Sequence, residues 1–105
     1  MLAILDEALR ELDAAAEYLE GERSGYGRLL LLAFDRKLEL ILAFPTSGSR
    51  VEGVAPEHGL RSYPISRFGY SILVGTIDGV ATIIAFMHQS REPGYWRDRV
   101  NHSSK

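Results

Sequence analysis

Hydrophobic and polar positions along this chain follow a helical period first and a strand-like alternation later. The most informative stretch, residues 70–88, places two apolar, β-rich runs on either side of Asp78-Gly79. Asp-Gly favours a two-residue type I′ turn, because both central residues of that turn need φ > 0. We therefore predict a β-hairpin, and because both faces of its strands are largely apolar we expect it in the middle of a sheet. The predicted facing pairs are Ile77–Val80, Val74–Ile83 and Ser71–Phe86.

The first half of the chain predicts two helices that form an antiparallel hairpin. The first begins at Asp6, a fitting N-cap, and ends at Gly21. Its apolar stripe comprises Leu5, Leu9, Leu12, Ala16 and Leu19. After a loop at residues 22–27, the second helix runs to about Phe44 and is ended by Pro45. Its predicted core face comprises Leu30, Phe34, Leu38, Ile41 and Leu42; Leu29, Leu31 and Leu32 widen this face, so burial on two sides is an open alternative.

The segments around the hairpin are shorter and less regular. Residues 45–59 contain two prolines and three glycines, which predicts a long loop. A strand-like run follows at Leu60–Ser66, where Pro64 indicates an edge position. After the hairpin, Pro93 can begin a short last helix, and residues 100–105 are expected to fray.

Together these elements predict one α+β domain over residues 1–105. An N-terminal helical hairpin packs on a small antiparallel β-sheet in the order (β)ααβββ, with a short C-terminal helix or tail. Whether Leu2–Leu5 forms a first strand stays open, because four residues do not decide between strand and coil.

Composition changes this picture little. With 105 residues, 46% hydrophobic and 25% charged, the chain suits one globular domain. It has no cysteine, which excludes disulfides and thiolate metal sites. No apolar run is long enough to cross a bilayer, so we expect no membrane partner and a cytoplasmic location.

Charge is distributed unevenly. Residues 1–22 carry seven acids and one base, whereas the rest of the chain carries eleven bases and seven acids. The net charge of -2 therefore hides a mildly basic second half, and a local patch sets the local potential. An anionic partner is not excluded by the overall charge.

Three motifs of the second half resemble the RelE/ParE superfamily of bacterial toxins. They are Arg67-Phe68-Gly69-Tyr70 before the hairpin, the acidic turn Asp78-Gly79, and His88-Gln89-Ser90-Arg91 at its end. The tail Pro93-Gly94-Tyr95-Trp96 also resembles that of many members, and the likeness spans roughly residues 3 to 98.

The resemblance implies the toxin of a type II toxin–antitoxin pair, held inactive by a cognate antitoxin. ParE-like members inhibit DNA gyrase by binding it. RelE-like members are endoribonucleases that cleave mRNA on the ribosome. A third alternative is a toxin-like domain that has lost its activity.

RNA cleavage by 2′-OH attack needs a base, cations for the phosphate and an acid for the leaving oxygen. RelE-like members carry an arginine directly after the residue that opens the third strand, and this chain has Ser71 there. A nuclease would therefore need a rearranged catalytic set, for which the candidates are His88, Arg67, Arg91 and Tyr95. The departure at Ser71 favours the ParE-like alternative.

Several of these residues have a simpler structural interpretation. Histidine is a common general acid or base, but by alternation His88 shares a face with Phe86 and Ile84, so packing is the stronger interpretation. For Trp96, the only tryptophan, folding back on the core as an anchor is the stronger interpretation, whereas it is the weaker one for Tyr95.

Arginines and aromatics of the second half form the predicted partner- or target-binding set, a composition enriched at interface hot spots. Alternation places Arg61 and Arg67 on one face, where a solvated role is the alternative. The whole set is Arg61, Arg67, His88, Arg91, Tyr95, Trp96, Arg97 and Arg99. We expect no cofactor and no metal, because the scattered His58, His88 and His102 lack ligand spacing.

Overall fold

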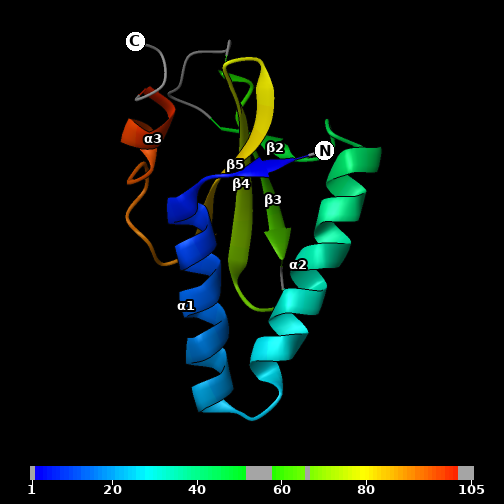
Figure 1. Cartoon of the computed structure of the whole chain (residues 1–105), viewed down its shortest axis with the longest axis vertical. Coiled ribbons are helices and arrows are strands. Elements are labelled where there is room, and N and C mark those ends of the chain that lie inside the picture. The colour runs from blue at the N-terminus through cyan, green and yellow to red at the C-terminus, as the bar shows by residue number, and fades with distance from the viewer. Residues whose placement is uncertain (1, 52–57, 66, 102–105) are drawn as a thin grey trace.

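The computed structural model describes residues 2–51, 58–65 and 67–101, in which two long helices cover one face of a five-stranded sheet (Figure 1). The predicted α+β class and the N-terminal helical hairpin are confirmed. The sheet order is β1-β5-β4-β3-β2, so the hairpin occupies its middle. The elements are β1 (Ala3–Ile4), α1 (Asp6–Glu22), α2 (Tyr26–Ala43), β2 (Ser49–Arg50), β3 (Arg61–Ile65), β4 (Tyr70–Ile77), β5 (Val80–His88) and α3 (Arg97–Asn101).

The central hairpin forms as predicted at its turn and departs from the prediction at its open end. Asp78 and Gly79 have φ of 51° and 78°, which are the positive angles of a type I′ turn. The pairs Ile77–Val80 and Val74–Ile83 form. Beyond them a β-bulge leaves Ile84 without a partner on β4, because the register shifts between Leu73 and Val74. Ser71 therefore faces Met87, and its predicted pairing with Phe86 is wrong.

Two very short strands complete the sheet. β1 pairs with β5 in parallel, so the sheet is mixed and the prediction of a wholly antiparallel sheet is wrong at this edge. β2 lies inside the segment predicted to be a loop and pairs with the start of β3. A strand of two residues is too short to show an alternating pattern. The sequence pattern therefore did not decide whether β1 forms, and it did not predict β2. β3 lies between β4 and β2 and runs through Pro64, so the predicted edge position is wrong for the strand as a whole. Pro64 itself lies past the residues that pair with β2.

The ends of α1 differ from the prediction. Leu5 occupies the N-cap position without a side-chain hydrogen bond, and Asp6 lies in the first turn. Asp6 is therefore not the cap, and it contributes a negative charge near the positive end of the helix. Gly21 lies within α1, which ends at Glu22. In the connection between α1 and α2, Gly25 has a positive φ and occupies the N-cap position of α2.

The buried face of α1 is shifted from the predicted stripe. Ala8, Leu12 and Ala15 are buried, whereas Leu9 is 43% exposed. Leu9 is preceded and followed in the sequence by other apolar residues, among them Ala8 and Leu12. The sequence pattern therefore does not determine the rotation of the helix about its axis. Alanines at the contact let the helix approach the sheet closely.

α2 buries Leu30, Phe34 and Ile41 as predicted, and Leu38 is partly buried against the same core. Leu42 is 53% exposed, so its predicted place on the core face is wrong. Leu31 and Leu32 are 39% and 44% exposed, so the alternative of burial on two sides is wrong as well. The exposed residues that share one side of the helix form what we call the α2 apolar surface: Leu29, Leu32, Leu40 and Phe44. None of the helices in the described part of the chain has the length and apolar content that a membrane crossing needs.

A second core lies on the sheet face opposite α1 and α2. There Trp96 and Val100 pack with Leu73 and Ile84. The last helix, α3, begins at Arg97 rather than near Pro93. Val100 is fully buried, so the prediction of fraying is wrong at this residue. Residues 102–105, with His102, lie outside the described residues.

Candidate functional site

Aromatic rings gather at the open end of the hairpin. Tyr70 pairs with His88 across the strands, and their rings meet edge to face with centroids 4.9 Å apart. Tyr70 also stacks on Phe86 at a centroid distance of 4.9 Å. Because the bulge places Ile84 in the opposite core, His88 shares a face with Phe86 but not with Ile84, contrary to the prediction. These contacts fix the position of the imidazole.

The hydrogen bonds of His88 assign its tautomer. The backbone N–H of Ser90 donates to Nδ1 over 3.1 Å, and the Ser90 hydroxyl lies 2.7 Å from the same nitrogen. Nδ1 is therefore an acceptor, and in the neutral ring the proton is on Nε2. His88 consequently presents an N–H donor on the side away from Ser90.

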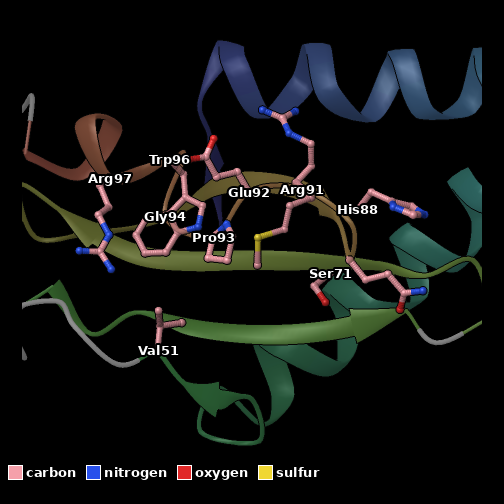
Figure 2. Close-up of a pocket in the computed structure, with 11 residues that line it drawn as sticks. Val51, Ser71, His88, Arg91, Glu92, Pro93, Gly94, Trp96 and Arg97 are labelled. Atoms are coloured by element: carbon pink, nitrogen blue, oxygen red, sulfur yellow. The ribbon is translucent and has the colours of Figure 1, made fainter.

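Two cavities flank the end of β5, and His88 and Arg91 line both. The first, which we call the tail cavity, measures about 300 Å³ and is bounded by the C-terminal segment (Figure 2). Trp96 and Pro93 supply apolar walls, and Ser71 lies on the strand beneath them. The tail cavity therefore combines an apolar interior with a few polar groups, the usual composition of a ligand site.

The second cavity, which we call the helix groove, measures about 250 Å³ and lies between α1 and the ends of β4 and β5. Its α1 side comes from Glu11, Ala14, Ala15 and Tyr18. Its sheet side comes from Tyr70, Phe86, His88 and Arg91. Figure 2 shows the guanidinium of Arg91 directed towards α1, away from Trp96. The charged end of Arg91 therefore belongs to the helix groove rather than to the tail cavity.

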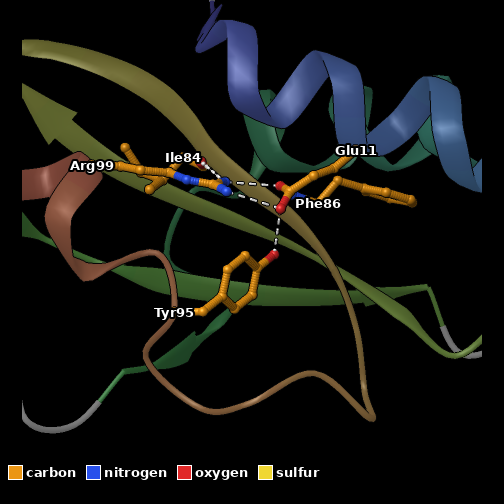
Figure 3. A network of polar contacts seen from close by, with 5 residues as sticks. All are labelled: Glu11, Ile84, Phe86, Tyr95 and Arg99. Atoms are coloured by element: carbon orange, nitrogen blue, oxygen red, sulfur yellow. Dashed lines mark hydrogen bonds and ion pairs between the residues drawn. The ribbon is translucent and has the colours of Figure 1, made fainter.

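A network around Glu11 ties the C-terminal segment to α1 (Figure 3). Arg99 donates to both carboxylate oxygens, over 2.9 and 3.0 Å, and also to the carbonyl of Ile84 over 3.1 Å. Tyr95 donates its hydroxyl to Oε2 over 2.8 Å, and the N–H of Phe86 donates to Oε1 over 3.0 Å. The network thereby satisfies backbone groups of β5 that lie past the end of β1.

This network also sets the ionisation of its members. Burial raises the pKa of Glu11, but hydrogen bonds from Arg99, Tyr95 and Phe86 outweigh burial, so the pKa lies below its ordinary value. Burial, with the hydrogen bond to Glu11, raises the pKa of Tyr95 to about 12. The phenol of Tyr95 therefore stays protonated and engaged at neutral pH.

Arg61 and Arg67 lie in different elements and do not share the predicted face of one strand. Arg61 donates to the carbonyls of Thr46 and Gly48, over 3.1 and 2.7 Å, and so holds the segment before β2 against β3. Arg67 lies in the turn before β4, with its guanidinium 5.6 Å from the ring centre of Phe68. Alternation does not extend past the end of β3, so the prediction of a shared face is wrong.

Trp96 and Arg97 are adjacent but differ in exposure. Trp96 is 4% exposed within the second core, as its alternative role as an anchor predicts. Arg97 is exposed at the tail cavity. Of the predicted site residues, His88 and Arg91 thus line both cavities, and Trp96 and Arg97 line the tail cavity alone.

The remaining predicted residues, which line neither cavity, are Arg61, Arg67, Tyr95 and Arg99. Sequence reasoning also missed Glu11, Tyr18 and Tyr70 as site residues. Their positions on α1 and β4 follow from helix–sheet packing between segments about seventy residues apart, as the contact of Glu11 with Phe86 illustrates. No local pattern marks such a contact.

Among the described residues, no group of three or more histidine or acidic side chains is placed to hold a metal ion. Comparison with protein-family models and with curated proteins finds no match for this chain. The functional argument therefore depends on the residues and their geometry.

Proposed function

We propose that this chain is the toxin of a type II toxin–antitoxin module, ParE-like in its action and RelE/ParE-like in its fold. It binds and inhibits DNA gyrase in the cytoplasm, and a cognate antitoxin neutralises it. The proposal is supported by three motifs that resemble that superfamily, at residues 67–70, 78–79 and 88–91. All three lie on the central hairpin or next to it.

One observation carries the choice of binding over catalysis. A ribonuclease of the rearranged kind would use Tyr95 with His88, Arg67 and Arg91, but the Tyr95 hydroxyl donates to Glu11 and lines neither cavity. A phenol with a pKa of about 12 in that bond is a poor proton donor or acceptor for RNA cleavage at neutral pH. The candidate catalytic groups do not converge on one point.

The α2 apolar surface supports a neutralising protein. Leu40 and Phe44 are 50% and 63% exposed, and they lie on the same side of the helix as Leu29 and Leu32. Arg36 lies between Leu32 and Leu40 in the same row of the helix, and exposed apolar side chains gathered on one helix face are typical of an interaction site. An antitoxin that covered them would remove this surface from water.

A gyrase supercoiling assay with the purified chain tests the proposal. We expect inhibition, and relief of that inhibition by the protein encoded next to this chain. Arg91→Gln should weaken inhibition about tenfold, the order of effect for an interface arginine. Arg10→Gln, at an exposed position of α1 that lines neither cavity, is the matched control. Full supercoiling at saturating protein would refute the gyrase target.

A second candidate function is a RelE-like, ribosome-dependent mRNA endoribonuclease. It is favoured by the position of His88, which lines both cavities, with Ser71 on the wall of the tail cavity and the guanidinium of Arg91 at the helix groove. In a translation extract this function predicts mRNA cleavage that His88→Ala abolishes without unfolding the chain. Absence of both inhibition and cleavage would indicate a toxin-like domain that has lost its activity.

A further inference from the structure

The helix groove is large enough for one side chain of a partner, and its floor is apolar. Its volume of about 250 Å³ is below the usual range of small-molecule pockets, about 300–1,000 Å³. Ala14 and Ala15 leave the space on the α1 side, and the stacked rings of Tyr70 and Phe86 form an apolar floor. Pockets of this kind receive single large side chains at protein interfaces.

The rim of the groove is rich in hydrogen-bond donors. Arg91 is exposed there, and His88 presents the N–H on Nε2 that its tautomer requires. Burial, and then the nearby Tyr18, raise the pKa of Tyr70, so its hydroxyl remains a donor at neutral pH. Within the described residues, the hydroxyls of Tyr18 and Tyr70 make no hydrogen bond and Arg91 makes no ion pair.

Glu11 does not cancel the positive charge of this rim. Both of its oxygens accept hydrogen bonds from Arg99, and each accepts one more bond, from Phe86 or from Tyr95. Arg91 is held over the ring of Tyr95, with its central carbon 3.8 Å from the ring centre. A carboxylate that entered the groove would meet a positioned guanidinium and further donors, which is the environment that favours a charge-assisted hydrogen bond.

We propose that the helix groove binds a segment of a partner protein that inserts one apolar side chain and places a single neighbouring carboxylate on Arg91. Tyr18, Tyr70 and His88 donate to the same carboxylate. This assignment rests on the proposed function only in taking the partner to be a protein. It adds Tyr18 and Tyr70 to the binding site and specifies the chemistry of the segment that they recognise.

The charge of α1 favours a peptide over a nucleic acid. The helix that forms one wall of the groove carries seven acids and one base, Arg10. A polyphosphate backbone that ran along this wall would be repelled at several points. A peptide can instead present a single carboxylate and follow it with neutral or basic residues, which the same wall attracts.

The test is an NMR titration of the isotope-labelled full chain with two blocked pentapeptides. One has a glutamate beside a phenylalanine, followed by lysines, and the other has glutamine in place of the glutamate. We expect the glutamate peptide to bind five- to tenfold more tightly, an effect of the order of one charge-assisted hydrogen bond. The shifted amides should cluster at Tyr18, Tyr70, His88 and Arg91.

Variants separate the groove from general charge attraction. In Arg91→Gln the preference for the glutamate peptide should fall below about twofold, and Tyr18→Phe, exposed and outside the core, should weaken binding about twofold to threefold. Arg10→Gln removes a cation from the same helix outside the groove and should retain the preference.

Three outcomes would overturn the assignment. They are equal affinity for both peptides, loss of the preference in Arg10→Gln as well as Arg91→Gln, and displacement of the peptide by a tighter-binding oligothymidylate, which would indicate a nucleic-acid site. Because the titration needs neither gyrase nor an antitoxin, its failure leaves the proposed toxin activity standing, and failure of the gyrase assay leaves the peptide result standing.

Discussion

Replacing Glu11 with alanine removes the carboxylate that accepts four hydrogen bonds from three residues, one on β5 and two in the C-terminal segment. The donors are the guanidinium of Arg99, through two nitrogens, the hydroxyl of Tyr95 and the N–H of Phe86. The side chains of Glu11 and Arg99 are each only 16% exposed. The substitution would therefore leave a largely buried cation and two further donors without their acceptor.

The expected loss of stability follows from these contacts. A hydrogen bond to a charged group contributes about 1.5–3 kcal/mol, and breaking a fully buried ion pair costs about 3–5 kcal/mol. The four bonds share one carboxylate and do not add, and Arg99 keeps some access to water. We therefore expect Glu11→Ala to lower the free energy of unfolding by about 3 kcal/mol. At about 4–8 °C per kcal/mol for a domain of this size, the melting temperature should fall by at least about 12 °C.

Urea unfolding followed by tryptophan fluorescence suits this measurement, because Trp96 is the only tryptophan and lies next to Tyr95 in the affected segment. Glu17→Ala makes the same substitution at an exposed position of α1 and should change stability by less than about 0.5 kcal/mol. A loss below about 1 kcal/mol in Glu11→Ala would refute the reasoning, since the network would then contribute no more than ordinary surface contacts.

The loss of stability in Glu11→Ala should depend on pH. The pKa of Glu11 is lower in the folded chain than in the unfolded chain. Its stabilising contribution is therefore fully present above the ordinary carboxyl pKa and is lost as the pH falls through the lowered value. The difference in stability between the wild type and Glu11→Ala should shrink in that acidic range. A difference that stayed constant with pH would show that the charge of Glu11 does not matter.

Three further predictions concern other parts of the fold. The Tyr95–Glu11 bond should stabilise fully below the ordinary tyrosine pKa of about 10 and be lost as the pH rises through about 12; in urea unfolding at a series of pH values, the gap to Tyr95→Phe should close over that interval. Trp96→Ala should cost about 3–5 kcal/mol by calorimetry, because the ring is buried, and a cost below about 1 kcal/mol would contradict its role as an anchor. Gly79→Ala should destabilise by about 1 kcal/mol because φ is 78° with open space around it, whereas Gly21→Ala within α1 should stabilise by about 0.5–1 kcal/mol; equal thermal shifts in the pair would contradict the turn assignment.

The sequence by itself determined the elements whose signals are local. The Asp78-Gly79 turn sets the register of the adjacent strands, since positive φ at two successive positions is a property of those residues and not of their surroundings. Apolar residues at helical spacing predicted both long helices, and Pro45 follows the second one within two residues of its end. The motif at residues 88–91 likewise pointed to His88 and Arg91, which the structure brings to the same cavities.

Only the tertiary structure decided the features that depend on contacts between distant segments. The bulge at Ile84 changes which side chains share a face with His88, and nothing in the alternation of β5 signals the extra residue. Glu11 is one of seven acids within residues 1–22 and no local pattern distinguishes it from the others, yet it contacts residues 75 to 88 positions away. Tyr95 and Arg99 were predicted to bind a partner, but both donate hydrogen bonds to Glu11. Periodicity reports which residues prefer to be buried, whereas partners across the fold are chosen by packing geometry, and that geometry exists only once helix, sheet and tail have come together.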